Sequence, residues 1–320
     1  MKIATIAYKQ CLTSRGLKKK AWSFLRNALI KLFNDPPCSL PIHGSLLKLP
    51  LSHKLPFHLK NHHFYDRLPR RISEYIHQKY GNLNCIDVGA NIGDTIASFY
   101  MEEADTFLAI EPNPPFHKLL LENWGRNKNV TFSSDICSNA SSEEMFAVQE
   151  KGGTASVIQV ETGLKMRRRP LDKIVNDYPF APNTNVIKVD TDGHDFEVIE
   201  GAAVLLAKCL PVVLFECDPF GNTEYVENCL RTLQLFKKCG YKNFLLYDNY
   251  GRLMGMYSLS DLSAFRNLLF YQLTTDFCYF DVLVVKNEDI MPFYKAEINY
   301  FAAKMSNKSL QRTAIAAVGL

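Results

Sequence analysis

Residues 85–95 read CIDVGANIGDT, and no other stretch of the chain limits its possible folds so strongly. A short apolar strand delivers Asp87 at its carboxyl end, two glycines enclose a tight loop, and a helix-forming segment follows at residues 95–100. Gly89 permits backbone angles that other residues resist, and Gly93 permits the helix to begin close to the strand. Unpaired amides at the helix start can face a polar ligand. The stretch therefore predicts a nucleotide-binding turn.

The loop differs from the G-x-G-x-x-G fingerprint of dinucleotide-binding proteins. Asn91 stands where the middle glycine would be, which leaves less room for a pyrophosphate. Glu111 follows the next apolar run, where a carboxylate can accept hydrogen bonds from both ribose hydroxyls of an adenosine. This order of strand, glycine loop, helix, strand and acid favours an adenosyl cofactor. The alternative is a purely structural turn, because tight strand-to-helix turns also need glycine.

Apolar runs alternate with helical patterns from residue 67 onwards. Strands are expected at residues 85–88, 107–110, 130–132, 186–189, 211–215, 243–246 and 280–285. Helices are expected at residues 67–80, 95–100, 116–124 and 198–208. Polar residues follow several of these strands, which predicts a doubly wound α/β sheet that is mostly parallel and seven-stranded. Asp135, after the third strand, either accepts from an adenine amino group or caps a turn.

Six segments of the chain resemble, in order, the FkbM family of S-adenosylmethionine-dependent methyltransferases. They are residues 86–95, 111–113, 170–172, 187–195, 200–202 and 214–216. A match in several parts arises by chance far less often than a single motif. The family commonly has Asp-Val-Glu-Gly where this chain has Asp-Thr-Asp-Gly at 190–193, so one carboxylate is shorter by a methylene. Residues 50–53 and 65–66 resemble the family as well.

The resemblance implies a Rossmann-like methyltransferase sheet with S-adenosyl-L-methionine as cofactor. The cofactor-binding residues would be Asp87, Gly89, Asn91, Gly93, Glu111 and Asp135. The usual substrates of the family imply O-methylation of a hydroxyl on a sugar, a glycan precursor or a related natural product.

Residues 190–195 follow the fourth expected strand, at the sheet edge where an acceptor would lie. Methyl transfer from a sulfonium is a direct displacement, so the enzyme mainly aligns donor and acceptor and removes the hydroxyl proton. His194 has the unperturbed pKa best suited to that step, and flanking acids can hold its tautomer; a histidine after a glycine turn can also simply cap a helix. Lys188 lies inside the strand and must pair with a carboxylate, and the nearest candidates are Asp190, Asp192 and Glu216. The candidate catalytic residues are therefore His194, Asp190 and Lys188.

The same acids raise two alternatives. Asp190, Asp192 and Glu216 are candidate ligands for Mg²⁺, whereas the glycine spacing rules out an EF-hand calcium loop. A metal-dependent glycosyltransferase would hold a metal and a sugar nucleotide with residues 190–192, but that reading does not explain the glycine loop and Glu111. A non-catalytic adenosyl-binding module is the other alternative, and the retained acids together with His194 disfavour it.

Three regions are expected along the chain. An N-terminal extension covers residues 1–64, a methyltransferase domain covers 65–290, and a helix with a frayed tail covers 291–320. Residues 21–33 form an amphipathic pattern directly after three lysines. Such a helix packs on its own domain or on a sister subunit, or it contacts an anionic membrane surface through residues 18–33. Short strands and loops are expected at residues 38–64.

Composition narrows the possible partners and compartment. A net charge of +4 over 320 residues is mild, and no basic run is interleaved with aromatics, so no nucleic-acid partner is expected. Nine scattered cysteines without C-x-x-C, and no apolar run of bilayer length, predict a cytoplasmic protein with free thiols. Residues 145–148 and 155–158 predict a strand pair, and the basic run at 165–169 predicts a solvated loop or a contact with an acidic acceptor.

Overall fold

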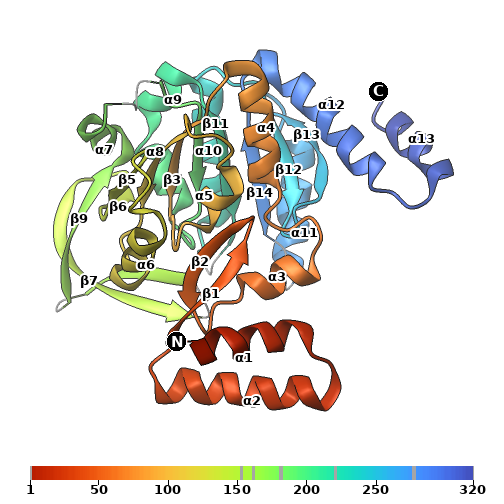
Figure 1. Ribbon diagram of the computed structural model, residues 1–320. Helices are drawn as coiled ribbons and strands as arrows, with labels where there is room; N and C mark the ends of the chain where they lie inside the picture. The colour runs from red at the N-terminus through yellow and green to blue at the C-terminus, as the bar shows by residue number, and fades with distance from the viewer. Residues whose placement is uncertain are drawn as a thin grey trace.

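The centre of the fold is one twisted eight-stranded sheet (Figure 1). The computed structural model describes residues 2–151, 154–160, 163–179, 183–219, 222–275 and 279–319. The strand order is β13-β12-β14-β11-β10-β3-β4-β5. These strands are β3 (Asn84–Val88), β4 (Thr106–Ile110), β5 (Val130–Ser133), β10 (Val186–Val189), β11 (Val212–Cys217), β12 (Asn243–Asp248), β13 (Leu253–Ser258) and β14 (Phe280–Val284). The five strands from β11 to β5 are parallel, and β14 joins β11 in antiparallel fashion.

The α/β fold predicted from the sequence is confirmed, and every one of the seven expected strands is present. The prediction was one strand short, because β13 forms an additional antiparallel edge next to β12. Its six residues are only partly buried or exposed, and Gly255 interrupts their side-chain pattern. An edge strand of this kind lacks the continuous apolar run that marks a buried parallel strand.

Helices cover both faces of the central sheet, as a doubly wound fold requires. One apolar layer contains α4 (Leu68–Tyr80), α5 (Asp94–Phe99), α6 (Pro114–Trp124) and α12 (Asn287–Ala303). The opposite layer contains α7 (Leu171–Ile174), α8 (Asp195–Glu200), α9 (Ala203–Cys209), α10 (Tyr225–Lys238) and α11 (Ser263–Thr274). Loops follow the carboxyl ends of the parallel strands.

The single helix expected at residues 198–208 is wrong, because the chain breaks it into α8 and α9 at Gly201. A Cβ atom on Gly201 would lie 2.0 Å from the carbonyl oxygen of Ser138, so glycine is required where these segments meet. Asp172 stabilises the start of α9, since its carboxylate accepts hydrogen bonds from the amides of Val204 and Leu205, both at 2.9 Å. Asp172 and Gly201 belong to two of the segments that resemble the FkbM family, and both thus help to form the turn between α8 and α9.

A second, four-stranded sheet stands beside the first, with the order β6-β9-β7-β8. Its strands are β6 (Ile136–Ser138), β7 (Ser142–Lys151), β8 (Thr154–Gln159) and β9 (Leu164–Pro170). The expected strand pair is present as β7 and β8, while the glycines between them lie outside the described residues. The solvated loop expected at 165–169 is wrong, because these residues form β9 and pair with both β6 and β7.

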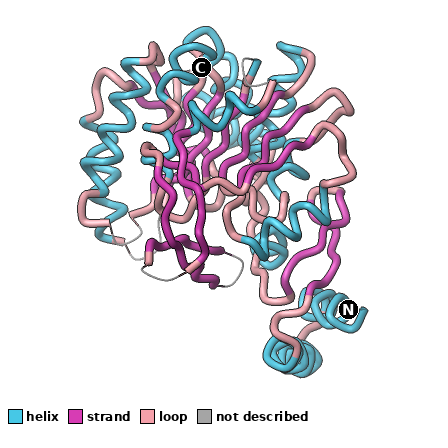
Figure 2. Tube along the Cα trace, turned by 90° about the vertical axis from the view of Figure 1, so that its left-hand side faces the viewer, coloured by secondary structure: helices cyan, strands magenta, loops and turns pink. Residues whose placement is uncertain are grey.

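The N-terminal extension contains more helix than expected. A hairpin of α1 (Lys2–Thr13) and α2 (Gly16–Leu32) projects from the body, as the views in Figures 1 and 2 both show. The strands β1 (Pro37–Ile42) and β2 (Ser45–Pro50) and the helix α3 (Leu55–Asn61) link the hairpin to α4. The expected helix at 21–33 begins earlier, so the three lysines lie within α2, while Leu32 and Phe33 are exposed rather than packed.

The C-terminal region is also more ordered than expected, since α13 (Lys308–Ala316) replaces the frayed tail. It is capped by Asn307, whose side chain accepts from the amides of Ser309 and Leu310. None of the described helices has the length and apolar character needed to cross a membrane. The eight cysteines in the described part of the chain are free thiols.

A buried ion pair connects α12 to α4. Arg71 Nε and Nη2 donate to the two carboxylate oxygens of Glu297 at 2.6 and 2.9 Å, and Tyr247 donates to the same carboxylate at 2.9 Å. Both charged side chains are less than a tenth exposed. Their hydrogen bonds offset the cost of burying two charges.

Arg71→Met should lower the free energy of unfolding by about 3–5 kcal/mol, because it leaves the Glu297 carboxylate buried without its cation. The double variant Arg71→Met with Glu297→Leu should recover much of that loss. Urea unfolding followed by circular dichroism measures both. A double variant as unstable as the single one would show that packing, rather than the uncompensated charge, dominates at this position.

Candidate functional site

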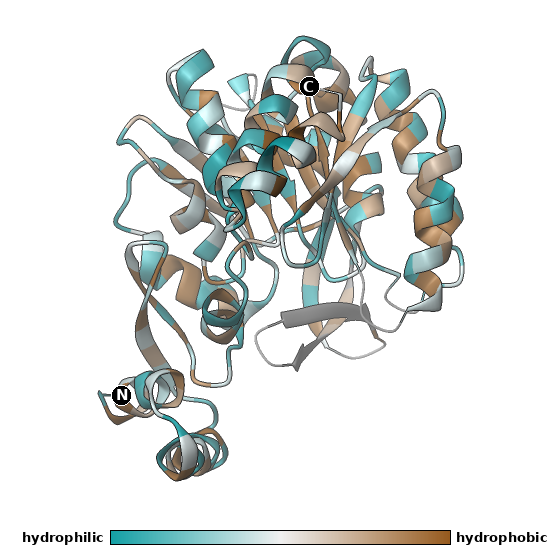
Figure 3. Ribbon diagram, turned by 90° about the vertical axis from the view of Figure 1, so that its right-hand side faces the viewer, coloured by the Kyte–Doolittle hydropathy of each residue, from teal (hydrophilic) through white to brown (hydrophobic). Residues whose placement is uncertain are grey.

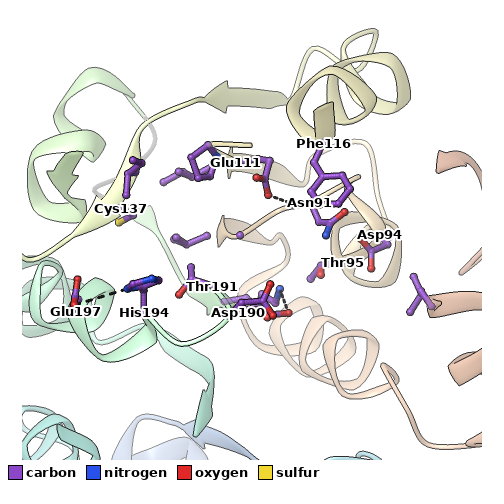
Figure 4. Close-up of a pocket in the computed structure, with 18 of the residues that line it drawn as sticks. Asn91, Asp94, Thr95, Glu111, Phe116, Cys137, Asp190, Thr191, His194 and Glu197 are labelled. Atoms are coloured by element: carbon purple, nitrogen blue, oxygen red, sulfur yellow. Dashed lines mark hydrogen bonds and ion pairs between the residues drawn. The ribbon is translucent and has the colours of Figure 1, made fainter. Parts of the chain in front are cut away.

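A cavity of about 430 Å³ opens at the carboxyl ends of β3, β4 and β10. Its wall is formed by the loops after these strands, by residues 136–138 of β6, by Arg168 of β9 and by the start of α3. In Figure 4, Asn91, Asp94, Thr95 and Phe116 lie toward one end of the cavity, and His194 with Glu197 lies toward the other. The cavity therefore joins the predicted cofactor loop to the predicted catalytic segment.

The glycine loop has the predicted geometry, but its glycines serve contacts within the protein. Gly89 and Gly93 have φ values of 80° and 81°, where side chains are strained. A Cβ atom on Gly89 would lie 1.8 Å from the carbonyl oxygen of Asp190, and one on Gly93 would lie 2.4 Å from the Trp124 ring. Gly89 lines the cavity, whereas Gly93 packs on α6 away from it.

Four backbone amides of the glycine loop are already paired within the protein. The amides of Gly89 and Ala90 both donate to the carbonyl of Ile110, at 2.9 and 3.0 Å. The amide of Asn91 donates to Glu111 at 2.8 Å, and that of Gly93 donates to Ala90 at 2.7 Å. Side chains, rather than these amides, must therefore supply most ligand contacts on this side.

Glu111 lies at the centre of this arrangement. Its Oε2 accepts from the amide of Asn91 and its Oε1 accepts from the amide of Asn113, both at 2.8 Å. The side chain is almost fully buried but lines the cavity, and burial raises its pKa to about 7 despite the two backbone donors. A carboxylate has about four acceptor positions, so it can still accept from ligand hydroxyls.

Lys188 forms ion pairs with one carboxylate that was predicted and with another that was not. Its Nζ lies 2.9 Å from Asp190 Oδ2, as expected, and 3.7 Å from Asp87 Oδ1 on the neighbouring strand. Burial lowers the pKa of Lys188, but the charges of Asp190 and Asp87 raise it well above the usual value overall. Lys188 and Asp190 line the cavity, whereas the fully buried Asp87 lies behind them. Burial raises the pKa of Asp87 to about 6.

His194 lies at the cavity wall in front of α8, and its side chain is 40% exposed. Its Nδ1 lies 3.9 Å from Glu197 Oε1, and this interaction raises the pKa of His194 above the usual value. The carboxylate of the flanking acid Asp195 accepts from the amide and hydroxyl of Thr191 at 3.1 and 2.9 Å, and its charge contributes less than Glu197 does to the raised pKa of His194. Glu197 is the acid that faces the imidazole (Figure 4).

Asp135 does not line the cavity. Its carboxylate binds Arg167 Nε at 2.5 Å and Arg169 Nη1 at 3.2 Å. These arginines alternate with Arg168, whose side chain points to the other face of β9 and into the cavity wall. The residues directly after Asp135 contribute to the wall in its place. Asp135 therefore lies outside this cavity, whereas Arg168, which was not a predicted site residue, lies in its wall.

The predicted magnesium ligands do not fit a metal site. Asp190 Oδ2 is paired with Lys188, and Glu216 borders a neighbouring smaller cavity rather than this one. Burial, followed by the charge of Asp190, raises the pKa of Glu216 well above its usual value. No group of three or more His, Cys, Asp or Glu side chains in the described ranges has an arrangement that could hold a metal ion.

Several cavity residues were not among the predicted site residues, although some lie in segments that the sequence singled out, such as residues 85–95 and 165–169. They are Lys54, Leu55, His58, Asp94, Thr95, Phe116, Arg168 and Glu197. His53 and Tyr65, which also line the cavity, lie in the two upstream segments that resemble the family. Burial lowers the pKa of His53 to about 4, so this ring is neutral near pH 7 and interacts with Asn91. The resemblance of residues 50–53 and 65–66 to the family was therefore the sequence feature that pointed to this part of the cavity wall.

Comparison with known proteins supports the resemblance. Residues 87–242 match the model of the Methyltransferase FkbM domain. The hexuronic acid methyltransferase AglP of Haloferax volcanii is 32% identical over 117 residues, which cover 36% of this chain and 48% of the relative. The match thus spans about half the length of this curated relative.

Among solved structures, similarity extends to two methyltransferases at low identity. Methyltransferase FkbM from Methylobacillus flagellatus has a TM-score of 0.36 and 15% identity, over 51% of this chain and 40% of that chain. The O-methyltransferase from Bacillus cereus in complex with SAH has a TM-score of 0.39 and 13% identity, over 68% of this chain and 81% of that chain. The glycine loop, Glu111 and His194 all lie within residues 87–242, the segment of the chain that matches the Methyltransferase FkbM domain.

Proposed function

We propose that this protein transfers a methyl group from S-adenosylmethionine to a hydroxyl of a sugar or glycan precursor. The observation that carries the proposal is one cavity, lined mainly by residues of the segment that matches the FkbM domain, that contains both Glu111 and His194. The family match favours methyl transfer over the glycosyltransferase alternative, and an imidazole facing the cavity favours catalysis over a binding module.

The residues present fit an adenosyl cofactor. Glu111 retains acceptor capacity for ribose hydroxyls, while Phe116 and Ile136 give the same cavity apolar surface suited to a base. Asp94 also lines the cavity, and burial raises its pKa to about 7. When bound, the cofactor supplies a methyl group on a cationic sulfonium. Ionised carboxylates on this side would favour such a cation.

His194 is the residue we propose as general base. It must be neutral to accept the hydroxyl proton, and the imidazolium that then forms is stabilised by Glu197 beside it. Lys188 and Asp190 neutralise each other at the cavity wall, so we assign them to positioning the loop and the acceptor rather than to proton transfer. The geometry also needs no metal ion to align a hydroxyl for direct displacement.

Arg168 favours an anionic sugar as acceptor. Its guanidinium lies 5.3 Å from the centre of the Phe146 ring, and its buried Nε has no hydrogen-bond partner among the described residues. Its charge acts on the pKa values of both His194 and Glu197, so it lies near the catalytic end. A guanidinium binds a carboxylate through two parallel hydrogen bonds. This arrangement suits a hexuronic acid, the substrate named for the Haloferax relative.

Glu111→Ala should weaken S-adenosylmethionine binding by about 1–3 kcal/mol, because it removes a buried acceptor and releases the amides of Asn91 and Asn113. Isothermal titration calorimetry measures the affinity. Glu103→Ala, which removes an exposed carboxylate before the same strand, is the matched control and should bind normally. Equal affinities in both variants would remove Glu111 from the site, and binding of sugar nucleotides instead would overturn the proposed function.

His194→Ala should reduce turnover by roughly 10²–10⁴-fold and leave cofactor affinity unchanged, since a general base contributes about that much. In the unmodified enzyme, turnover should fall as the pH drops through the raised pKa of His194, because protonation removes the base. Glu197→Gln should move this fall to lower pH, since the interaction that raises the pKa is weakened. Steady-state rates from pH 5 to 9 test this; an unshifted profile in both variants would exclude His194.

Arg168→Gln should weaken the binding of methyl glucuronide to the S-adenosylhomocysteine-loaded protein by about 10- to 100-fold, through loss of a charge-assisted pair. Binding of methyl glucoside should not change. Lys165→Gln removes the same charge from the same strand, but Lys165 pairs with Glu143 outside the cavity, so this control should retain the preference. A wild-type protein that binds both sugars equally would refute the role of Arg168 without affecting the cofactor assignment.

A further inference from the structure

The N-terminal hairpin has an unusual charge composition. Residues 1–34 contain eight basic residues and no aspartate or glutamate, whereas the whole chain carries a net charge of only +4. The bases are Lys2, Lys9, Arg15, Lys18, Lys19, Lys20, Arg26 and Lys31. Because the hairpin contains no acid, none of these charges is neutralised within it. The hairpin is thus a strongly cationic projection on a body of opposite net charge.

The two helices of the hairpin pack on each other through their inner faces. Leu29 of α2 is buried, and Trp22 and Leu25 are partly buried against the same apolar cluster. Ala4 and Tyr8 of α1 belong to that cluster. The spacing of 22, 25 and 29 is that of one helical face, so the opposite face of α2 is turned away from the body.

That outer face of α2 is apolar as well as basic. Leu17 and Phe24 are 83% and 78% exposed and lie seven residues apart on one helical stripe, and Leu32 at the end of α2 is 77% exposed. Lys20 and Lys31 lie on the same stripe and are exposed too. Figure 3 shows brown and teal residues side by side on the hairpin, at the lower end of the molecule. Three large apolar side chains held in water need a reason, because such a stripe is normally covered.

We infer that this hairpin docks on an anionic lipid surface. Lysines flanking exposed Leu and Phe on one helix are the pattern of an interfacial helix, in which the apolar groups enter the headgroup boundary and the bases contact anionic headgroups. A second copy of the hairpin is a poor occupant, since two projections with eight bases each repel one another. A nucleic acid would satisfy the lysines but leave the leucines and phenylalanine unexplained.

The hairpin is joined to the wall of the cavity through α3. Tyr8 of α1 stacks on Phe57 of α3 with ring centres 5.2 Å apart, and Arg26 of α2 lies 4.9 Å above the Tyr8 ring. Arg26 Nε also donates to the carbonyl of Leu51 at 2.8 Å. Four residues just before and within α3 line the cavity, namely His53, Lys54, Leu55 and His58. Docking would therefore hold this wall next to the lipid, whether or not the proposed methyl transfer is correct.

Vesicle co-sedimentation tests the inference on the full chain. Vesicles of phosphatidylcholine with phosphatidylglycerol should bind the protein, vesicles of phosphatidylcholine alone should bind it weakly, and added salt should release it. Replacing Lys18, Lys19 and Lys20 with Gln should weaken binding by about 10- to 100-fold, since each base near such a surface contributes substantially. Leu17→Gln combined with Phe24→Gln should weaken it independently of salt.

Matched controls distinguish a specific effect of the hairpin residues from a general effect of removing exposed charges or exposed apolar side chains. Lys237→Gln with Lys238→Gln removes exposed bases from α10, and Phe270→Gln removes an aromatic of α11 that is 70% exposed; both variants should bind like the unmodified protein. Absence of binding to either vesicle, equal binding to both, or hairpin variants that bind normally would each overturn the inference. A dimer that the Leu17 and Phe24 changes dissolve, without vesicle binding, would assign the face to a second copy and also overturn it.

Discussion

A lysine ammonium buried in the middle of the central sheet is the constraint on which the cavity depends. Lys188 is 7% exposed and lies on β10, in register with Asp87 of β3. A buried cation must be paired, so the loop after β10 has to bring Asp190 back onto the lysine while Asp87 remains behind it. The carbonyl of the same Asp190 fills the space that a side chain at Gly89 would occupy. The two loops that border the cavity are therefore fixed to each other and cannot be repositioned separately.

Most of the central sheet could be predicted because its parallel strands are buried on both faces. Such strands appear as short apolar runs rich in valine, isoleucine and leucine, and the runs at 107–110 and 212–215 are examples. β13 and β9 lack this pattern, since one is a half-exposed edge and the other contains three consecutive arginines that the second sheet accommodates by alternating their directions. A search for apolar runs does not detect a strand that carries several charged residues.

The candidate site was predictable to the extent that its residues lie next to strand ends. Glu111, Asn91, Asp190 and His194 were found in this way and do line the cavity. Asp135 also follows a strand, but its two arginine partners are more than thirty residues away in the chain. No local sequence pattern predicts such a pairing. The amides of the glycine loop are occupied by Ile110 and Glu111 for the same reason. Partners distant in sequence decided each of these differences.

Asp172 and Gly201 belong to the segments that relate this chain to its family, yet neither lines the cavity. Asp172 accepts hydrogen bonds from amides at the start of α9. Gly201 has no side chain, which allows the chain to pack closely against residues of β6 and β9. A family signature thus combines residues that keep a reaction possible with residues that keep layers of the fold in contact. The cavity wall contributed by α3 and β9 lies largely outside that signature. Divergence in acceptor choice can therefore proceed in the wall while the signature stays intact, and relatives with the same signature need not share a substrate.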